Sequence, residues 1–404
     1  MSIELLERLS QPNESKLVLL VLDGVGDLRT PSQPRTPLEM ADTPNLDALA
    51  AAGSTGRIVP VEPGITPGSG PGHLALFGYD PREPEADIGR GVLEALGADV
   101  EIRAGDVAAR GNFASADEDG NVTDRRAGRI STEECRRLVE KLRGAVPDDL
   151  GIEVRIQAGE GHRFVLLLRG RELSPELADT DPQQTGVPPE PVRAVEPEGE
   201  RTAEAVRRLL RSFEETLADE ERANRVLLRG FSTLPALRTL EELYGIRCGA
   251  FAGYPLYRGV AAVCGMEKLP SGQSFGEILD RVEESWDRFD YLFLHVKKTD
   301  QAGEDGSLED KVAALEAVNR ELPRLLDLGP DVLAVTGDHS TPAPMKRHSW
   351  HPVPLVLVSE TAFVDPVERY DEASVIGGHL GTIPSRHLLG LMLAHGGRLA
   401  KFGA

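Results

Sequence analysis

Cysteine is scarce in this chain. Its 404 residues include three cysteines, Cys135, Cys248 and Cys264. An odd number of cysteines without CxxC spacing indicates neither a disulfide framework nor a zinc ribbon. Aromatic residues make up only 5% of the chain, yet 40% of the residues are hydrophobic and 27% are charged, which is typical of a globular protein and does not indicate disorder.

Long hydrophobic segments are lacking as well. The apolar run 17–22 is too short to cross a bilayer. Residues 1–7 have neither the basic start nor the apolar stretch of a signal peptide. We therefore expect a cytoplasmic protein that does not insert into a membrane.

Positive charge is in short supply. The chain has 45 Lys and Arg residues against 66 Asp and Glu residues, and its formal net charge is -21. Nucleic acids and anionic membrane surfaces are bound chiefly by Lys and Arg side chains that neutralise phosphates. The charge balance therefore argues against both as partners.

What the chain does have is an alternation of strand and helix patterns. Because 404 residues exceed one ordinary core, we expect two domains. The larger is predicted to be an α/β domain whose mostly parallel sheet is covered by helices on both faces. Its expected strands are 17–22, 57–61, 226–228, 247–251, 291–296, 332–336 and 353–358, and its expected helices are 45–52, 200–218, 275–289 and 308–326.

The segment 105–177 has a different character, because polar turns alternate there with short apolar runs. It also holds an amphipathic helix near 133–143, which Ser131 and Glu134 introduce as a capping box. We predict that this segment is a smaller α+β cap inserted into a core made of residues 1–104 and 178–404. The turn formers at 179–191 suit a hinge between the two domains.

Polar side chains follow two of the apolar runs. Asp23 comes after 17–22, and Asp338 and His339 come after 332–336. The buried strands of an open α/β sheet end where such folds place their ligand sites. Each residue alone is more often a turn former or a satisfied polar group, but the joint pattern predicts one site.

Ser69 lies between these segments in the chain, in Thr66-Pro-Gly-Ser-Gly70 at the start of a predicted helix. A hydroxyl beside a metal ion and near a helix N-terminus loses its proton more easily than in water. Ser69 is therefore the candidate nucleophile. Pro67 and Pro71 occupy the glycine positions of the GxSxG elbow of α/β-hydrolases, which disfavours a hydrolase triad.

Further candidate metal ligands lie downstream, at Asp300, Glu304 and His348. Carboxylates and imidazoles are ligands for Mn²⁺ or Zn²⁺. Together with the two acids and the histidine that follow the strands, these residues suffice for two ions. Two ions can stabilise both the attacking and the leaving oxygen of a phosphoryl transfer.

Two basic clusters stand out against the negative net charge. Arg125, Arg126 and Arg129 precede the predicted helix at Ser131, and guanidinium groups beside a helix N-terminus suit an anion site. A solvated basic turn is the alternative. The second cluster is Lys297-Lys298, which ends the strand 291–296; one of the two ammonium groups is expected beside Asp300.

The order of these motifs resembles that of the archaeal-type 2,3-bisphosphoglycerate-independent phosphoglycerate mutases, members of the alkaline phosphatase superfamily. The resemblance covers nearly the whole chain. Its most specific pieces are Leu22-Asp-Gly-Val-Gly-Asp27, Thr43-Pro-Asn-Leu-Asp47, Thr66-Pro-Gly-Ser-Gly-Pro-Gly-His73 with Phe77-Gly-Tyr-Asp-Pro81, Ala109-Arg-Gly-Asn-Phe113, Asp124-Arg-Arg-Ala-Gly-Arg129, Tyr254-Pro-Leu-Tyr-Arg-Gly259, His295-Val-Lys297 and Thr336-Gly-Asp-His-Ser-Thr341.

The resemblance implies two divalent cations and no 2,3-bisphosphoglycerate. One cation would be held by Asp23, Ser69, Asp338 and His339, and the other by Asp300, Glu304 and His348. The family usually has a histidine where this chain has Glu304, and a carboxylate there favours a hard ion such as Mn²⁺ or Mg²⁺ over Zn²⁺. We expect Mn²⁺, with Mg²⁺, Co²⁺ and Zn²⁺ as alternatives. His351 is a spare imidazole that either replaces the missing ligand or lies on the surface.

The resemblance also implies an isomerase that moves the phosphoryl group of a small-molecule substrate, phosphoglycerate, through a phosphoserine. The cap would close to keep water out. Asp124 would act as acid and base, or else orient a neighbouring arginine. The expected substrate-binding residues are Arg125, Arg129, His162, Arg163 and Lys297. A metal-dependent phosphatase or phosphotransferase acting on another small ester, and a non-catalytic protein of the same fold, are the alternatives.

Overall fold

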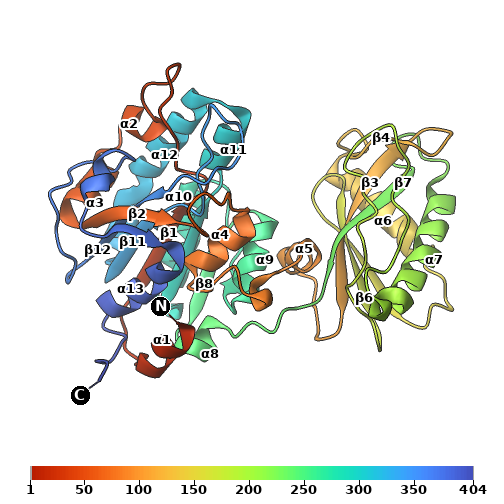
Figure 1. Cartoon of the computed structure of the whole chain (residues 1–404), viewed down its shortest axis with the longest axis horizontal. Helices are drawn as coiled ribbons and strands as arrows, with labels where there is room; N and C mark the ends of the chain where they lie inside the picture. Colours follow the sequence, from red (N-terminus) through yellow and green to blue (C-terminus); the bar gives the residue numbers. More distant parts are fainter. Residues whose placement is uncertain (1, 404) are drawn as a thin grey trace. The chain divides into compact units, whose positions relative to one another are not determined.

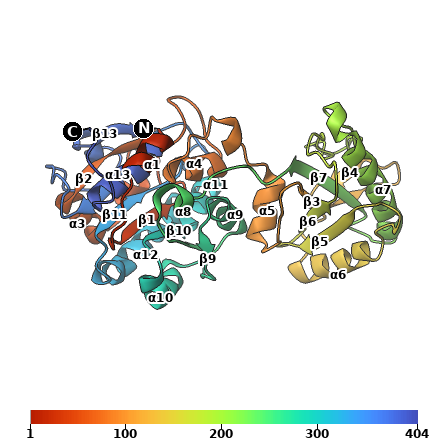
Figure 2. The ribbon, with the colours of Figure 1, turned by 90° about the horizontal axis from the view of Figure 1, so that it is seen from below.

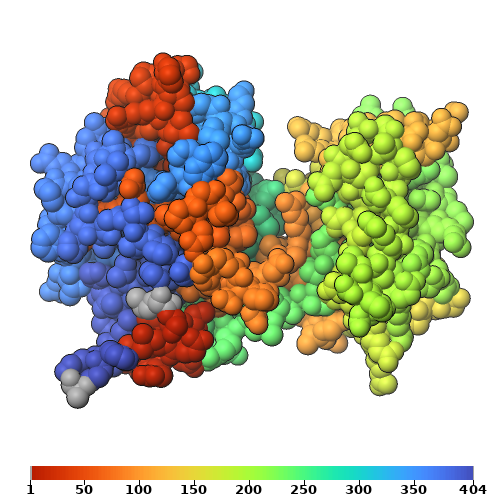
Figure 3. Space-filling model, in the orientation of Figure 1, coloured from red at the N-terminus to blue at the C-terminus, as the bar shows by residue number. Residues whose placement is uncertain are grey.

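The computed structural model describes residues 2–403 and divides the chain into two compact units. The first unit consists of Met1–Asp87 with Leu237–Ala404, and the second of Ile88–Ala236. In the sequence colours of Figure 3, the first unit shows red and blue surfaces from both ends of the chain, and the second shows mainly yellow-green ones. The second unit is therefore an insertion into the first.

An eight-stranded sheet forms the centre of the first unit (Figure 1). Its strands, in spatial order, are β13 (Gly381–Pro384), β2 (Ser54–Val59), β12 (Val353–Ser359), β11 (Val332–Thr336), β1 (Leu17–Leu22), β10 (Tyr291–Val296), β8 (Cys248–Ala252) and β9 (Glu267–Lys268). Only β12 runs antiparallel to its neighbours β11 and β2; the other pairs are parallel. The predicted α/β fold with a mostly parallel sheet is confirmed.

The sequence of β1 explains its central position. All six residues of Leu-Val-Leu-Leu-Val-Leu are buried, as expected for a strand with helices on both faces of its sheet. The strand pairs in parallel with β10, where Leu22 lies opposite Val296, and with β11, where Val21 lies opposite Thr336. These three strands therefore end side by side.

Helices cover both faces of this sheet (Figure 2). On one face α12 packs against α2, α3, α10 and α11, and on the other α4 packs against α9 and, through the turn before it, α13. The helices of the first unit are α1 (Ile3–Leu9), α2 (Pro37–Met40), α3 (Pro44–Ala52), α4 (Ser69–Leu76), α8 (Leu240–Tyr244), α9 (Pro255–Val263), α10 (Phe275–Ser285), α11 (Lys298–Asp305), α12 (Leu308–Asp327) and α13 (Leu388–His395).

The second unit has a five-stranded antiparallel sheet with helices packed on it. Its strands are β3 (Val107–Ala116), β4 (Val122–Asp124), β5 (Glu153–Ala158), β6 (Arg163–Arg169) and β7 (Arg225–Ser232). Its helices are α5 (Arg90–Gly97), α6 (Thr132–Arg143) and α7 (Glu200–Leu217). The core of the unit includes Phe113, Phe164 and Phe213, which are fully or almost fully buried.

The extent of the second unit differs from the expected cap 105–177. Its limits lie at 88 and 236, because β7 pairs with β3 and both α5 and α7 pack on this small sheet. The expectation that the strand 226–228 and the helix 200–218 belong to the main sheet is therefore wrong. Local patterns predicted both the strand and the helix. Which sheet they join is decided by the pairing of β7 with β3, more than 100 residues earlier in the chain.

The expected hinge at 179–191 is not where the chain passes between the units. Thr180 lies inside the second unit, where its N–H donates to Leu228 O at 2.9 Å and its Oγ1 accepts from Leu228 N at 2.8 Å. The chain passes between the units at 87–88 and at 236–237 instead. The proline-rich segment is thus held against β7 by one backbone hydrogen bond and one side-chain hydrogen bond of Thr180.

Several elements lie outside the expected ones. The helices α9, α11 and α13 and the short edge strands β9 and β13 have too few residues for a clear periodic signal. Within residues 2–403, no helix is long and apolar enough to cross a membrane. All three cysteines are buried and free, in agreement with the prediction of no disulfide.

Lys311 of α12 ties together the segments that follow β1 and β11. Its side chain is fully buried, and Nζ donates to Gly26 O at 3.2 Å, Asp27 Oδ2 at 3.0 Å and Thr341 O at 2.8 Å. A buried ammonium is tolerated only with such partners, because desolvation of a charge is costly. The interaction fixes two neighbouring strand ends.

We predict that Lys311→Met lowers the free energy of unfolding by about 3–5 kcal/mol, because Asp27 would keep a buried charge without its cation. Urea unfolding would measure the change. Lys298→Met is the matched control, because Lys298 is exposed and its loss should cost less than about 0.5 kcal/mol. Equal stability of the two variants would contradict this role of Lys311.

Candidate active site

The carboxyl ends of β1 and β11 bring two acids and one histidine together. Asp23 Oδ1 lies 3.3 Å from His339 Nε2, and Asp338 Oδ2 lies 3.2 Å from the same nitrogen. All three side chains are fully buried. The convergence predicted from the apolar runs is therefore present.

Ser69 reaches the same nitrogen from the other side. It is the first residue of α4, and its Oγ lies 3.4 Å from His339 Nε2. The helix approaches the Asp338 segment so closely that a Cβ at Gly72 would lie 2.6 Å from the backbone oxygen of Asp338. Glycine at this position thus lets α4 hold Ser69 against the buried acids.

A second group of possible ligands adjoins the first. Asp300 in α11 is fully buried, and its Oδ1 lies 3.6 Å from His348 Nε2 and accepts a hydrogen bond from Thr341 Oγ1 at 2.6 Å. The rings of His348 and His339 stack with their centroids 3.6 Å apart. The ligand atoms of Asp300, His339 and His348 all lie within 4.8 Å of one another.

The unusual Glu304 lies at the margin of this second group. Its Oε1 is 3.8 Å from His348 Nε2, and 53% of its side chain is exposed. His351 does not join the group, since its Nδ1 lies 3.0 Å from Ser349 Oγ and its ring stacks on Trp350. His351 is not among the residues whose ligand atoms converge in either group.

Lys297 lies between the two groups. Its Nζ is 3.0 Å from Asp23 Oδ2 and also pairs with Asp300 Oδ2. Burial by itself would lower the pKa of Lys297, but the charges of the two carboxylates outweigh it and raise the pKa above its ordinary value. Lys297 thus remains a cation. Lys298, the other lysine of the predicted basic pair, is exposed to solvent.

Two histidines of the site have no role in the sequence predictions. His73 Nδ1 lies 3.2 Å from Asp338 Oδ2 and 2.8 Å from the backbone oxygen of Ser69, one helical turn earlier. His295 Nε2 lies 3.2 Å from Asp23 Oδ2. A sequence signal existed for both, because His73 follows Ser69 by four positions on one helix and His295, in β10, precedes Lys297 by two positions.

The buried charges of the site control one another's ionisation. Burial opposes ionisation of Asp23, but Lys297, His295 and His339 hold its pKa well below the ordinary value. Burial also opposes protonation of His73, yet the carboxylate of Asp338 raises its pKa above the ordinary value. Asp23 is therefore an anion at neutral pH.

The donor atoms fit divalent cations. Both carboxylate oxygens of Asp23 and Oδ2 of Asp338 are buried without a hydrogen bond among residues 2–403, although cationic side chains lie near them. Orphaned carboxylate oxygens are costly in a protein interior. Together with the imidazole of His339 they form a ligand set that suits Mn²⁺ or Zn²⁺.

In the second unit, Arg125 is engaged by a partner that the sequence did not reveal. Its Nε and Nη2 each donate at 2.7 Å to the carboxylate of Asp181, a bidentate pair. Asp124 does not pair with Arg125 or Arg126; its carboxylate accepts the backbone N–H groups of Arg126 at 2.7 Å and Gly128 at 2.8 Å. Asp124 therefore shapes the turn that presents the arginines.

His162 lies in a positively charged part of the same unit. Burial lowers the pKa of His162 to about 4, and the charges of Arg163, Arg110 and Arg126 act in the same direction. Arg129 is exposed on the adjoining turn, with a left-handed φ of 55°. Arg125, Arg129, His162 and Arg163 thus lie in the second unit, whereas Lys297 lies in the first. Asp124 is also close enough to influence the pKa of His162.

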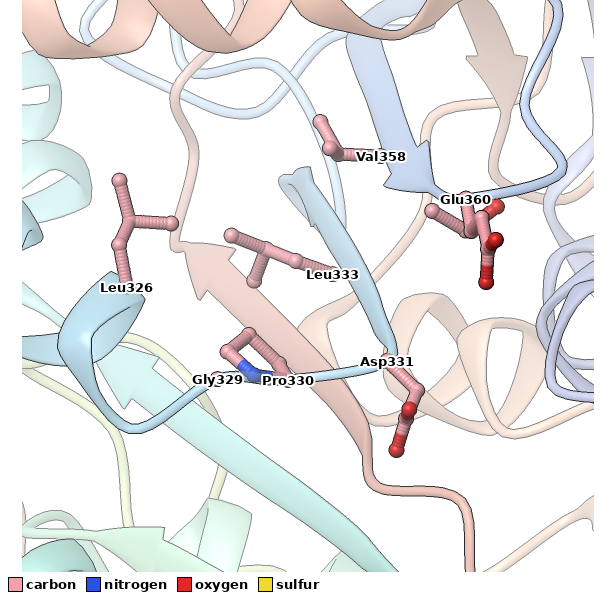
Figure 4. A pocket seen from close by; sticks show the side chains of 8 residues that line it. Leu326, Gly329, Pro330, Asp331, Leu333, Val358 and Glu360 are labelled. Carbon is pink, nitrogen blue, oxygen red and sulfur yellow. The ribbon is translucent and has the colours of Figure 1, made fainter.

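A cavity of about 340 Å³ lies away from this chemistry (Figure 4). Leu326, Leu333 and Val358 line it, with the carboxylates of Asp331 and Glu360 at its margin. Asp331 precedes β11 and accepts the N–H of Lys16 at 2.7 Å, so it lies at the end of that strand opposite Asp338. The cavity is therefore separate from the Ser69 site.

Comparison with known proteins identifies the family of this arrangement. A probable 2,3-bisphosphoglycerate-independent phosphoglycerate mutase from Thermus thermophilus is 48% identical over 402 residues, which cover 99% of this chain and 98% of the relative. This chain belongs to the 2,3-bisphosphoglycerate-independent phosphoglycerate mutase family. The model of that family matches residues 50–223. Membership makes the protein an isomerase that does not require 2,3-bisphosphoglycerate.

Solved structures agree with this assignment. A protein from Pyrococcus horikoshii matches with a TM-score of 0.82 and 28% identity, over 97% of this chain and 100% of that one. A cofactor-independent phosphoglycerate mutase from Thermoplasma acidophilum matches with a TM-score of 0.70 and 28% identity, over 94% of this chain and 100% of that one. The family resemblance inferred from the motifs is confirmed.

We predict that Mn²⁺ raises the melting temperature of the protein and that EDTA reverses the effect. A ligand that binds only the folded state stabilises it by about 2.7 kcal/mol at a hundred times its Kd. Asp23→Asn should abolish most of the shift, because it removes a buried ligand charge. Thermal unfolding followed by circular dichroism would measure both effects.

Asp331→Asn is the control for this measurement, since Asp331 lies at the other end of β11 and should leave the Mn²⁺ shift intact. A Mn²⁺ shift that survives in Asp23→Asn, or its absence from the wild-type protein, would contradict cation binding by the buried acids.

Proposed function

We propose that this chain interconverts 3-phosphoglycerate and 2-phosphoglycerate through a phosphoserine at Ser69. The observation that carries the proposal is that Ser69 and two buried acids surround the same nitrogen of His339. His339 Nε2 lies 3.4 Å from Ser69 Oγ, and within 3.3 Å of carboxylate oxygens of both Asp23 and Asp338. A hydroxyl held near buried acids that could bind a cation is what a cation-assisted nucleophile requires.

Two divalent cations would occupy the site. One would be held by Asp23, Ser69, Asp338 and His339, and the other by Asp300, Glu304 and His348. When bound, the cations would lower the pKa of the Ser69 hydroxyl and neutralise charge on the transferred phosphoryl group. We propose Mn²⁺, because a ligand set rich in carboxylates favours hard ions.

In the first half of the reaction, Ser69 Oγ enters as the alkoxide, its proton already released to solvent, and forms a bond to phosphorus while the bond from phosphorus to the glycerate oxygen breaks. That oxygen takes up one proton, which leaves free glycerate and phosphoserine. In the second half, the other glycerate hydroxyl loses one proton and attacks the phosphoserine, and Ser69 Oγ departs. The net change is the position of the phosphoryl group, without an external donor.

We propose that Asp124 moves the proton in both halves, donating it to the departing oxygen and removing it from the attacking hydroxyl. Its carboxylate is oriented by the N–H groups of Arg126 and Gly128. Two accepted hydrogen bonds leave lone pairs on both oxygens for a substrate hydroxyl.

Charged side chains would bind the anionic ends of the substrate. Arg129, His162 and Arg163 would bind the carboxylate or the phosphate, and Lys297 would bind the phosphoryl group beside Ser69. Arg125 would contribute its Nη1, because its other nitrogens engage Asp181. These groups offset a protein charge of -21 near an anionic substrate.

We also propose that the reaction takes place in the cytoplasm. Three buried thiols without a disulfide suit a reducing compartment.

Replacement of the nucleophile tests the proposal directly. We predict that Ser69→Ala loses mutase activity by about 10³-fold or more, because no side chain can then carry the phosphoryl group. Phosphorus NMR of a mixture with 3-phosphoglycerate would follow 2-phosphoglycerate and inorganic phosphate together.

Ser32→Ala is the control, since Ser32 is exposed and its loss should leave turnover unchanged. Retained activity in Ser69→Ala would end the phosphoserine scheme. Release of inorganic phosphate without 2-phosphoglycerate by the wild-type enzyme would show a phosphatase in its place.

The role of His162 predicts a pH effect. In the unfolded chain His162 binds a proton near pH 6.5, but in the folded protein only near pH 4, so stability falls as pH falls from about 6.5 to 4. A bound phosphoglycerate would favour the imidazolium, and we predict that it raises the pKa of His162. Proton NMR of the imidazole would measure the pKa with and without the substrate.

His379 is the control resonance, because it is exposed and lies in the first unit. If saturating phosphoglycerate leaves the pKa of His162 near 4, His162 does not bind the substrate.

A further inference from the structure

Tyr257 lies in the site beside Ser69 and Lys297, and the proposed phosphoryl transfer gives its side chain no role. It lies in the first turn of α9, which begins at Pro255 shortly after the end of β8. Its side chain is almost fully buried, with 1% exposure. The ring stacks on His295 with centroids 3.8 Å apart and lies 4.8 Å from the ring of His73. The ring is therefore fixed between the two histidines.

The hydroxyl of Tyr257 lies between a cation and the nucleophile. Lys297 Nζ is 2.8 Å from the hydroxyl oxygen, and Ser69 Oγ is 3.5 Å from it. An ammonium group has only donors, so the phenol oxygen must be the acceptor in the contact with Lys297. The single proton of the phenol is thereby left to face another acceptor. Ser69 Oγ is in reach, and the carboxylate of Asp23 is a second acceptor beside the same hydroxyl.

The hydroxyl of Tyr257 is also buried close to carboxylates. Burial raises the pKa of Tyr257 well above its ordinary value, and the carboxylates of Asp23 and Asp338 raise it further. A long contact of 3.5 Å to a neutral hydroxyl can shorten when the acceptor becomes charged.

We propose that Tyr257 is a further catalytic residue, whose hydroxyl, anchored by Lys297, donates a hydrogen bond to Ser69 Oγ when that oxygen carries negative charge. The inference rests on the proposed phosphoserine reaction. No proton is transferred by Tyr257. Its hydrogen bond stabilises Oγ before the bond to phosphorus forms and again as that bond breaks, when Ser69 is the leaving group.

This role has a consequence that a packing role lacks. A hydrogen bond to a charged oxygen is stronger than one to the neutral bridging oxygen of a phosphate ester. The bond to Tyr257 therefore favours the free enzyme over the phosphoserine form. Loss of the hydroxyl should slow the departure of Ser69 and shift the enzyme toward phosphoserine.

Tyr257→Phe tests the inference, because it removes one oxygen and keeps the ring between His295 and His73. We expect kcat to fall by about 10- to 100-fold, the steady-state fraction of phosphoserine to rise, and KM to change little. Acid quench followed by intact-protein mass spectrometry would measure the phosphoserine fraction. Mn²⁺ affinity and melting temperature should remain those of the wild-type protein.

Tyr291→Phe is the matched control. Tyr291 begins β10, at the end of the strand opposite Lys297, and its buried hydroxyl has no hydrogen-bond partner among residues 2–403. Removal of this hydroxyl should change neither kcat nor the phosphoserine fraction.

The outcomes separate this inference from the proposed function. Wild-type kcat and phosphoserine levels in Tyr257→Phe, with Ser69→Ala inactive, would overturn the role of Tyr257 alone. Activity in Ser69→Ala would overturn the phosphoserine reaction itself. A loss of turnover in Tyr257→Phe that matches a loss of Mn²⁺ affinity would also overturn the inference, because the hydroxyl would then act by holding Lys297.

Discussion

Three buried carboxylates with too few cations near them are the constraint on which this site depends. Asp23, Asp300 and Asp338 are fully buried, and Lys297 pairs with the first two. Ionised carboxylates in a protein interior are tolerated only when nearby positive charges or donors compensate them. Lys297 is the single ammonium group that pairs with these acids, and we propose that divalent cations complete the balance of charge in the site.

The scaffold positions these charges rigidly because it places them at the ends of buried parallel strands. β1 lies between β10 and β11, so Asp23 and Lys297 emerge side by side and Asp338 follows on the neighbouring strand. Lys311 donates hydrogen bonds to backbone oxygens in the segments that follow β1 and β11, which holds these two segments together. A nucleophile that must face two charged groups at once benefits from this preorganisation, since little reorganisation is left for the reaction.

The strands of the large sheet and the buried acids Asp23 and Asp338 could be predicted from the sequence because both are local signals: an apolar run, then an acid. Tyr257 was given no role because a tyrosine in a short helix looks like an ordinary core residue until its neighbours are known, and the spacing of His295 from Lys297 was a signal left unused. The pair between Arg125 and Asp181 joins positions 56 residues apart, which no local pattern reveals. The limits of the second unit were misplaced for the same reason, since β7 pairs with β3 across a long stretch of chain.

Anomalous scattering from crystals grown with Mn²⁺ tests the need for cations most directly. Two peaks are predicted, one among Asp23, Asp338 and His339 and the other beside Asp300 and His348, and the first should disappear in Asp23→Asn. Crystals of active enzyme that show no peak at these side chains would contradict the central claim, because the buried acids would then be balanced without metal.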